Sequence, residues 1–205
     1  MPDLSHESRW RAEGFLRIAG IDEAGRGPLA GPVSAAAVIL PEGYEHPILN
    51  DSKQLSEKRR EAIYEEIISD PRIAWASAIV EAEEIDRINI LRATHLAMAR
   101  AYEKLVPRPD LALIDGRPVK SFPGEHRALV KGDTLSLSIA AASIIAKVER
   151  DRIMLDCATR FPGYGFERHK GYGTVTHLAA LNGLGPCLIH RRSFAPVAQS
   201  ELKSK

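Results

Sequence analysis

Short apolar runs alternate with longer segments of helical periodicity along most of the chain. The runs at residues 15–22, 33–40, 72–80 and 111–116 predict strands, and residues 126–133 predict another. Because the second run is rich in alanine, a helix is an alternative prediction for residues 33–40.

Helices are predicted where apolar residues recur every three or four positions. Ser56 is suited to cap a helix that runs to residue 69, and a second helix at 89–105 ends before two prolines. A long alanine-rich helix is expected at 134–161 and a short one near 175–185. Because strands come first and then alternate with helices, the pattern predicts an α/β fold with a sheet packed on both faces.

Length and cysteine usage restrict the class of protein. A chain of 205 residues fits one domain. No stretch approaches the roughly 20 apolar residues of a membrane span, and the acidic start lacks the apolar core of a secretory signal. Cys157 and Cys187 belong to no C-x-x-C pair, so we expect reduced thiols in a cytoplasmic protein.

The net charge of +1 hides a difference between the two halves of the chain. Residues 1–100 carry 12 basic and 17 acidic side chains, whereas residues 101–205 carry 16 basic and 10 acidic ones. A basic C-terminal half is compatible with a polyanionic partner, although a chance distribution over a solvated surface gives the same numbers.

Acidic residues at strand ends are the first candidates for chemistry. Asp22 and Glu23 stand side by side where the first strand meets a glycine-rich run, and like charges this close need solvent, a cation or a catalytic task. Asp115 closes another strand, and Asp133 precedes the long helix. Asp115 could also belong to an Asp-Gly turn, and Asp133 could cap the helix.

The sequence allows two other interpretations of this region. Gly25, Gly27 and Gly31, with Asp51 further on, resemble a loosened dinucleotide-binding fingerprint, but the spacing is wrong and prolines interrupt the required helix. A nucleic-acid-binding module without catalytic activity is the second reading. A protein that only binds polyanions gains nothing from carboxylates on its binding face.

Seven strings of residues carry a resemblance to a known family. They occur in order from about residue 17 to residue 194, and "DEAGRGP" alone is long and specific. The chain resembles the type 2 ribonucleases H, in particular bacterial ribonuclease HII. The strings are "GIDEAGRGPLAGPV", "DSKQLSEKRR", "LIDG", "VKGD", "AASIIAKVERD", "HKGYGT" and "HRRSF".

This resemblance implies an activity and a metal site. It implies an RNase H-like mixed sheet flanked by helices, with a helical C-terminal region. The implied enzyme hydrolyses the RNA strand of RNA–DNA hybrids and cleaves 5′ to single ribonucleotides in duplex DNA during ribonucleotide excision repair. Two Mg²⁺ or Mn²⁺ ions would act in the hydrolysis, giving 5′-phosphate and 3′-hydroxyl ends. The implied catalytic and metal-binding residues are Asp22, Glu23, Asp115 and Asp133.

The resemblance also implies a set of substrate-binding residues. The backbone of Gly25, Arg26 and Gly27 would read the 2′-hydroxyl, and Tyr172 would stack on the sugar of the next nucleotide. Tyr172 could instead be an aromatic core residue. The candidates for phosphate contact are Lys53, Ser143 and Lys147, with Arg191 and Arg192 as less specific additions.

The predicted organisation is a catalytic domain at 17–194 between flexible segments at 1–16 and 195–205. We expect a monomer. Its expected partners are RNA–DNA hybrids and ribonucleotide-containing duplex DNA, and no membrane. Another RNase H-like metal-dependent nuclease is the alternative function, because such enzymes share carboxylate chemistry on similar folds.

Overall fold

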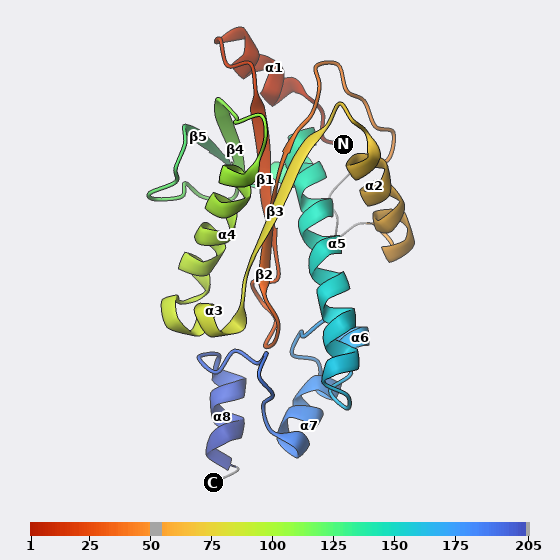
Figure 1. The fold of residues 1–205 in the computed structure, drawn as a ribbon, viewed down its shortest axis with the longest axis vertical. Helices are drawn as coiled ribbons and strands as arrows, with labels where there is room; N and C mark the ends of the chain where they lie inside the picture. Colours follow the sequence, from red (N-terminus) through yellow and green to blue (C-terminus); the bar gives the residue numbers. More distant parts are fainter. Residues whose placement is uncertain (50–54, 204–205) are drawn as a thin grey trace.

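A five-stranded mixed sheet forms the centre of the computed structural model, which describes residues 1–49 and 55–203 (Figure 1). The strand order is β3-β2-β1-β4-β5, with β1 antiparallel to β2 and parallel to β4. The strands are β1 (Ile18–Ala24), β2 (Val33–Ile39), β3 (Ala74–Val80), β4 (Leu111–Asp115) and β5 (His126–Leu129).

Helices cover both faces of this sheet. Helices α3 and α4 pack on one face, whereas α5 and α2 pack on the other (Figure 1). The α/β architecture expected from the sequence is thereby confirmed. The helices are α1 (Ser5–Ala12), α2 (Glu57–Ser69), α3 (Ala82–Ile88), α4 (Ile90–Lys104), η2 (Gly132–Thr134), α5 (Leu137–Arg160), α6 (Phe166–His169), α7 (Val175–Leu184) and α8 (Ala195–Lys203).

Small residues in the central strands let the helices approach closely. Ala35 and Ala37 of β2 lie in the core beneath α4, and Ala36 lies in the core beneath α5. This two-sided burial explains why the segment is rich in alanine yet forms a strand. On β1, a Cβ built at Gly20 would lie 2.1 Å from the carbonyl carbon of Ser138 in α5, so only glycine fits.

The path of the chain after β1 excludes a dinucleotide-binding fold. The glycine-rich turn leads into β2, which returns antiparallel to β1. A dinucleotide site requires a helix at this point, followed by a parallel strand. Asp51, the proposed ribose ligand in that reading, lies outside the described residues.

Two helices occur in the terminal segments, where the sequence predicts none. Helix α8 contains much of the last segment, and α1 lies against the N-terminal end of α5. Glu7 of α1 is buried, and its Oε1 accepts hydrogen bonds from Ser136 Oγ at 2.6 Å and from the backbone N–H of Ser138 at 3.1 Å. The prediction that these segments are flexible and lie outside the catalytic domain stays a prediction.

None of the helices in the described part of the chain is both long and apolar enough to cross a membrane.

The close contact between β1 and α5 generates a test of the fold. We expect Gly20→Ala to lower the free energy of unfolding by about 3 kcal/mol or more, because the methyl group meets backbone atoms that cannot rotate away. Gly183→Ala in α7 is the control, since nothing lies within 4 Å of its Cβ position. The control should gain up to about 1 kcal/mol from helix propensity. Equal melting temperatures for both variants would contradict this packing.

Candidate metal and nucleic-acid site

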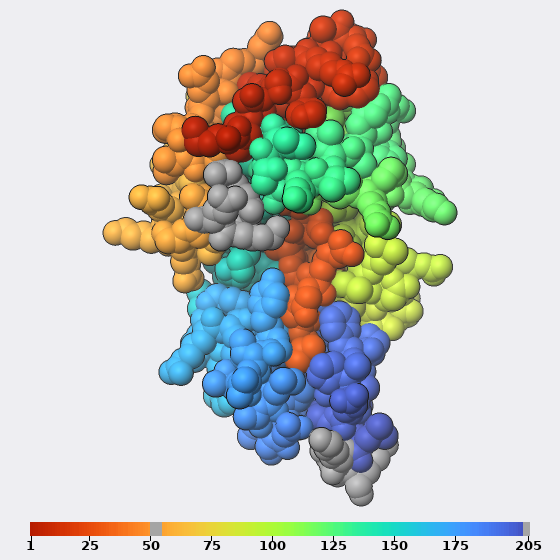
Figure 2. All heavy atoms as spheres, turned by 180° about the vertical axis from the view of Figure 1, so that it is seen from behind, coloured from red at the N-terminus to blue at the C-terminus, as the bar shows by residue number. Residues whose placement is uncertain are grey.

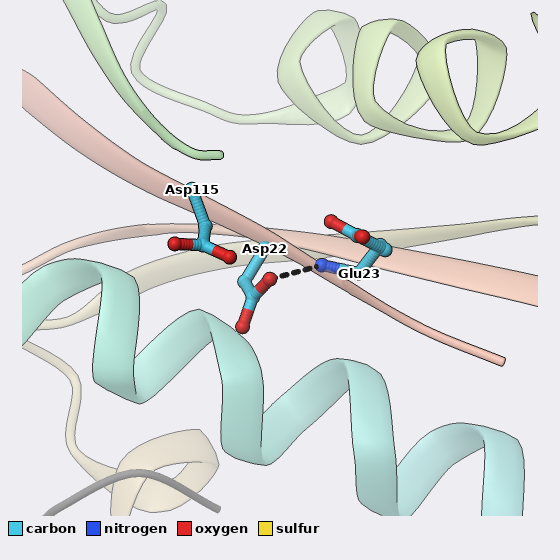
Figure 3. Close-up of side chains that lie close together, drawn as sticks. All are labelled: Asp22, Glu23 and Asp115. Carbon is cyan, nitrogen blue, oxygen red and sulfur yellow. Dashed lines mark hydrogen bonds between the residues drawn. The ribbon is translucent and has the colours of Figure 1, made fainter. Parts of the chain in front are cut away.

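Three carboxylates converge where β1 and β4 end. These strands are parallel with Ile21 paired to Ile114, so the residues that follow, Asp22 and Asp115, emerge side by side. Figure 3 shows both side chains together with Glu23, the next residue of β1. One carboxylate oxygen from each of the three residues lies within 4.8 Å of the others. The topology therefore joins two distant parts of the sequence into one acidic cluster.

Burial and mutual repulsion oppose the ionisation of Asp22. Its pKa is raised well above the ordinary value, first by burial and then by the charges of Glu23 and Asp115. Hydrogen bonds from the Glu23 backbone N–H, at 2.7 Å, and from the Ser143 side chain partly offset this rise. A cation bound at the cluster would remove the remaining penalty.

Glu23 lies in a less hostile environment than Asp22. Burial raises its pKa, but Arg26, whose Nη1 donates to Glu23 Oε1 at 3.2 Å, lowers it. The nearby charge of Asp115 adds a smaller rise. Arg26 is the one basic side chain hydrogen-bonded to this carboxylate in the described residues, and it leaves the cluster with a net negative charge.

The donor set fits hard divalent cations. All three side chains offer only carboxylate oxygens, and the cluster borders two hollows, so water and phosphate have access. Mg²⁺ and Mn²⁺ take oxygen ligands of this kind and keep positions open for other ligands. The residues present therefore suit a divalent metal site.

Asp133 does not join the three converging carboxylates. It is buried in η2, and its neighbour Gly132 donates a backbone N–H to Asp115 Oδ1 at 2.6 Å. The alternative role as a helix cap is wrong, because Ser136 caps α5 by accepting from the N–H of Ile139. Asp133 thus adjoins the cluster through Gly132, and its role as a metal ligand stays a prediction.

The structure gathers most of the predicted substrate-binding residues around one cavity of about 220 Å³. This cavity opens beside the acidic cluster, and Lys53 lies outside the described residues. Residues from the glycine-rich turn and from α5 line it together with an aromatic ring from the C-terminal region. The lining residues are Asp22, Glu23, Ala24, Gly25, Arg26, Gly27, Asp115, Ser143, Lys147 and Tyr172.

Tyr172 is an exposed wall of this cavity. Tyr172 is 44% exposed, which argues against the alternative that it is an aromatic core residue. A Cβ built at Gly27 would lie 3.6 Å from Tyr172 Cε1, so the ring stands against the glycine-rich turn. Gly25 has a φ of 96° and packs on the buried Arg150 side chain, a position that a larger residue could not occupy.

The two candidate phosphate contacts on α5 differ in their surroundings. Ser143 is buried and hydrogen-bonds Asp22, so it supports the acidic cluster. Lys147 is partly exposed, and its Nζ lies 2.6 Å from Asp151 Oδ1. Burial lowers the pKa of Lys147, while Asp151 opposes that change. Neither observation tests phosphate contact, which stays a prediction for both residues.

Arg191 has a structural role that the sequence does not indicate. Its guanidinium group is completely buried, which makes the predicted phosphate contact wrong. It donates to the backbone carbonyls of the glycine-rich turn, and burial lowers its pKa to about 9. Arginine is rarely buried this deeply, so composition and spacing gave no signal for this residue.

Comparisons with known proteins identify a family for this chain. The family model for Ribonuclease HII matches residues 19–197. The Ribonuclease HII of Cereibacter sphaeroides strain KD131 is 57% identical over 197 residues, covering 96% of this chain and 92% of the relative.

Two solved structures resemble the fold. The ribonuclease H2 of Pyrococcus horikoshii superposes with a TM-score of 0.75 at 25% identity, covering 92% of this chain and 98% of that one. Bst-RNase HIII, determined in complex with Mn²⁺, gives a TM-score of 0.71 at 18% identity and covers 93% of this chain and 70% of that one. These likenesses show the fold, and the family match together with the 57% identity to the Cereibacter sphaeroides enzyme shows that the protein belongs to the ribonuclease HII family.

Proposed function

We propose that this ribonuclease HII, which acts on RNA–DNA hybrids, also cleaves on the 5′ side of single ribonucleotides in duplex DNA. The observation that carries the proposal is the position of the acidic cluster beside the cavity formed by the glycine-rich turn and Tyr172. A scissile phosphate at the cluster leaves the adjoining sugars next to the turn and the ring.

The carboxylates provide the metal-binding part of the mechanism. Asp22, Glu23 and Asp115 would hold two divalent cations, with Asp133 completing the set from the adjoining η2 helix. When bound, such ions activate a water for in-line attack and stabilise the leaving 3′-oxygen, giving 5′-phosphate and 3′-hydroxyl ends. Ser143 orients Asp22 by hydrogen bonding, and Arg26 holds Glu23 at 3.2 Å.

Mg²⁺ and Mn²⁺ both suit an all-oxygen site. The Mn²⁺ complex of Bst-RNase HIII supports manganese as one of the ions that this fold accepts. We propose a monomer that acts in the cytoplasm, where Cys157 and Cys187 stay as the free thiols that the structure contains.

Substrate selection would come from the turn and the ring together. The backbone of Gly25, Arg26 and Gly27 lines the cavity without Cβ obstruction at two of its three positions, which suits the close approach of a ribose. Tyr172 faces the same cavity, where a flat ring stacks on a deoxyribose but is crowded by a 2′-hydroxyl. Such a pair recognises a ribose followed by a deoxyribose.

Removing one carboxylate tests the metal site. We expect Asp22→Asn and Asp115→Asn each to lower the cleavage rate of a single-ribonucleotide duplex by about 100-fold or more, because each loses a metal ligand. Asp156→Asn, at an exposed position in α5, should retain wild-type activity. EDTA should abolish cleavage by the wild type and by this control. Activity within about tenfold of wild type for both cluster variants at saturating Mg²⁺ would contradict the assignment.

Changing the ring tests substrate selection. Tyr172→Ala should lose about 5- to 150-fold in rate on a single embedded ribonucleotide, the equivalent of about 1–3 kcal/mol of stacking. Tyr172→Phe should lose far less, because it keeps the ring. The measurement compares kcat/KM on this substrate and on an all-RNA hybrid. An unchanged ratio in Tyr172→Ala, with a lowered melting temperature, would show that the residue is only structural.

A further inference from the structure

Three segments that are far apart in the sequence are bound to one another beneath the cavity. The backbone N–H of Leu29 donates to the carbonyl of Gly171 at 2.8 Å, and the N–H of Arg191 donates to the carbonyl of Leu29 at 2.8 Å. Ala30 and His190 form an isolated β-bridge. In Figure 2, the orange-red segment of the glycine-rich turn is bordered by the blue C-terminal segments. Leu29, at the end of the glycine-rich turn, is thus hydrogen-bonded both to the segment that carries Tyr172 and to Arg191.

The Arg191 side chain holds the glycine-rich turn from below. It is 0% exposed, and no carboxylate lies within salt-bridge distance of it among the residues that the structure describes. A buried guanidinium group requires acceptors for its donors, and here backbone carbonyls provide all of them. The acceptors are the carbonyl oxygens of Gly25 at 2.6 Å, Pro28 at 2.8 Å, Gly31 at 2.9 Å, Pro32 at 3.0 Å and Arg26 at 3.1 Å.

The side chain of His190 reaches Tyr172 through a second histidine. The backbone N–H of Cys187 donates to His190 Nδ1 at 3.0 Å, which places the proton of the neutral ring on Nε2. His190 Nε2 lies 3.1 Å from His177 Nε2 and donates to it. His177 Nδ1 then carries the proton and donates to the carbonyl oxygen of Tyr172 at 2.9 Å.

The relay of hydrogen bonds from His190 through His177 to Tyr172 requires both imidazole rings to be uncharged, and their surroundings meet that requirement. His177 and His190 are buried, with exposures of 0% and 1%. Burial lowers the pKa of both, that of His190 to about 4, so that neither carries a charge at neutral pH. The groups that face the pair are Phe166, Tyr164, His169 and Cys187, together with the more distant charge of Arg192.

We propose that His190 and Arg191 form a positioning element that sets the separation between the glycine-rich turn and Tyr172, and thereby the selectivity for a ribose–deoxyribose junction. The inference rests on the proposed function, because it assumes that these two parts read the substrate. Neither residue touches the substrate. Arg191 acts through the carbonyls of residues 25–32, and His190 acts through His177.

The experiment measures selectivity as the ratio of kcat/KM on a single-ribonucleotide duplex to kcat/KM on an all-RNA hybrid. Arg191→Lys keeps the charge but loses the fork that serves five carbonyls. His190→Gln breaks the relay and leaves Arg191 in place. We expect each to lower the ratio by about 5- to 100-fold, since small misplacements of reading groups are costly. The double variant should lose little more than the worse single one, because both changes disturb the same separation.

Two comparisons separate selectivity from folding. Arg160→Lys, at an exposed position at the end of α5, should leave the ratio unchanged. Melting curves identify any variant that fails to fold. If Arg191→Lys fails to fold, the ratio measured for His190→Gln still tests the positioning role.

The outcomes distinguish this inference from the proposed function. If Tyr172→Ala lowers the ratio while Arg191→Lys and His190→Gln lower only the melting temperature, the positioning role is overturned and the proposed function stands. If Tyr172→Ala leaves the ratio unchanged, the reading of the junction is wrong, and the positioning role is overturned with it.

Discussion

The mutual repulsion of Asp22, Glu23 and Asp115 is the constraint on which the site depends. Oxygen atoms from the three carboxylates lie within 4.8 Å of one another, and burial raises the pKa of Asp22 well above its ordinary value. No packing arrangement needs such a cluster, so it destabilises the folded chain until a cation compensates it. The parallel pairing of β1 with β4 places Asp22 beside Asp115, so this repulsion follows from the topology of the sheet.

Positive charge is distributed in a complementary way. Arg150 and Arg191 are both completely buried behind the glycine-rich turn. All the donor groups of Arg191 and the Nε and Nη2 of Arg150 reach carbonyl oxygens of residues 25–32. Each hydrogen bond to a carbonyl oxygen restricts the backbone conformation of the turn beside the cavity. Arg150 also lies 6.0 Å from the centre of the Tyr172 ring. Arg150 therefore adjoins both the turn and the ring.

The sequence predicts the sheet well because its signals are strong. The apolar runs of β1 to β4 and the periodicity of α4 and α5 are long enough to read, and Ser56 caps α2 as predicted. Helix α6, with four residues, and α3, with seven, are too short to produce a period. Helix α1 depends on a buried glutamate that contacts α5, a tertiary interaction that no local pattern encodes.

The site was predictable only in part, for a similar reason. Asp22, Glu23 and Asp115 could be found from the family motifs, and their convergence follows from strand pairing. The structure leaves Asp133 outside that group and buries Arg191, which the sequence suggests as a phosphate contact. Burial of a charged side chain depends on acceptors that come from distant segments, and sequence patterns do not reveal them.

Thermal unfolding of the wild type and of Asp22→Asn at pH 8, in EDTA and in saturating Mn²⁺, tests the role of the acidic cluster most directly. In EDTA the variant should melt at the higher temperature, because a neutral amide relieves both the burial of charge and the repulsion. Mn²⁺ at about 100 times its Kd should stabilise the wild type by about 2.7 kcal/mol, or roughly 5–11 °C, and the variant far less. A variant that melts below the wild type in EDTA, or an equal rise for both proteins in Mn²⁺, would contradict the account.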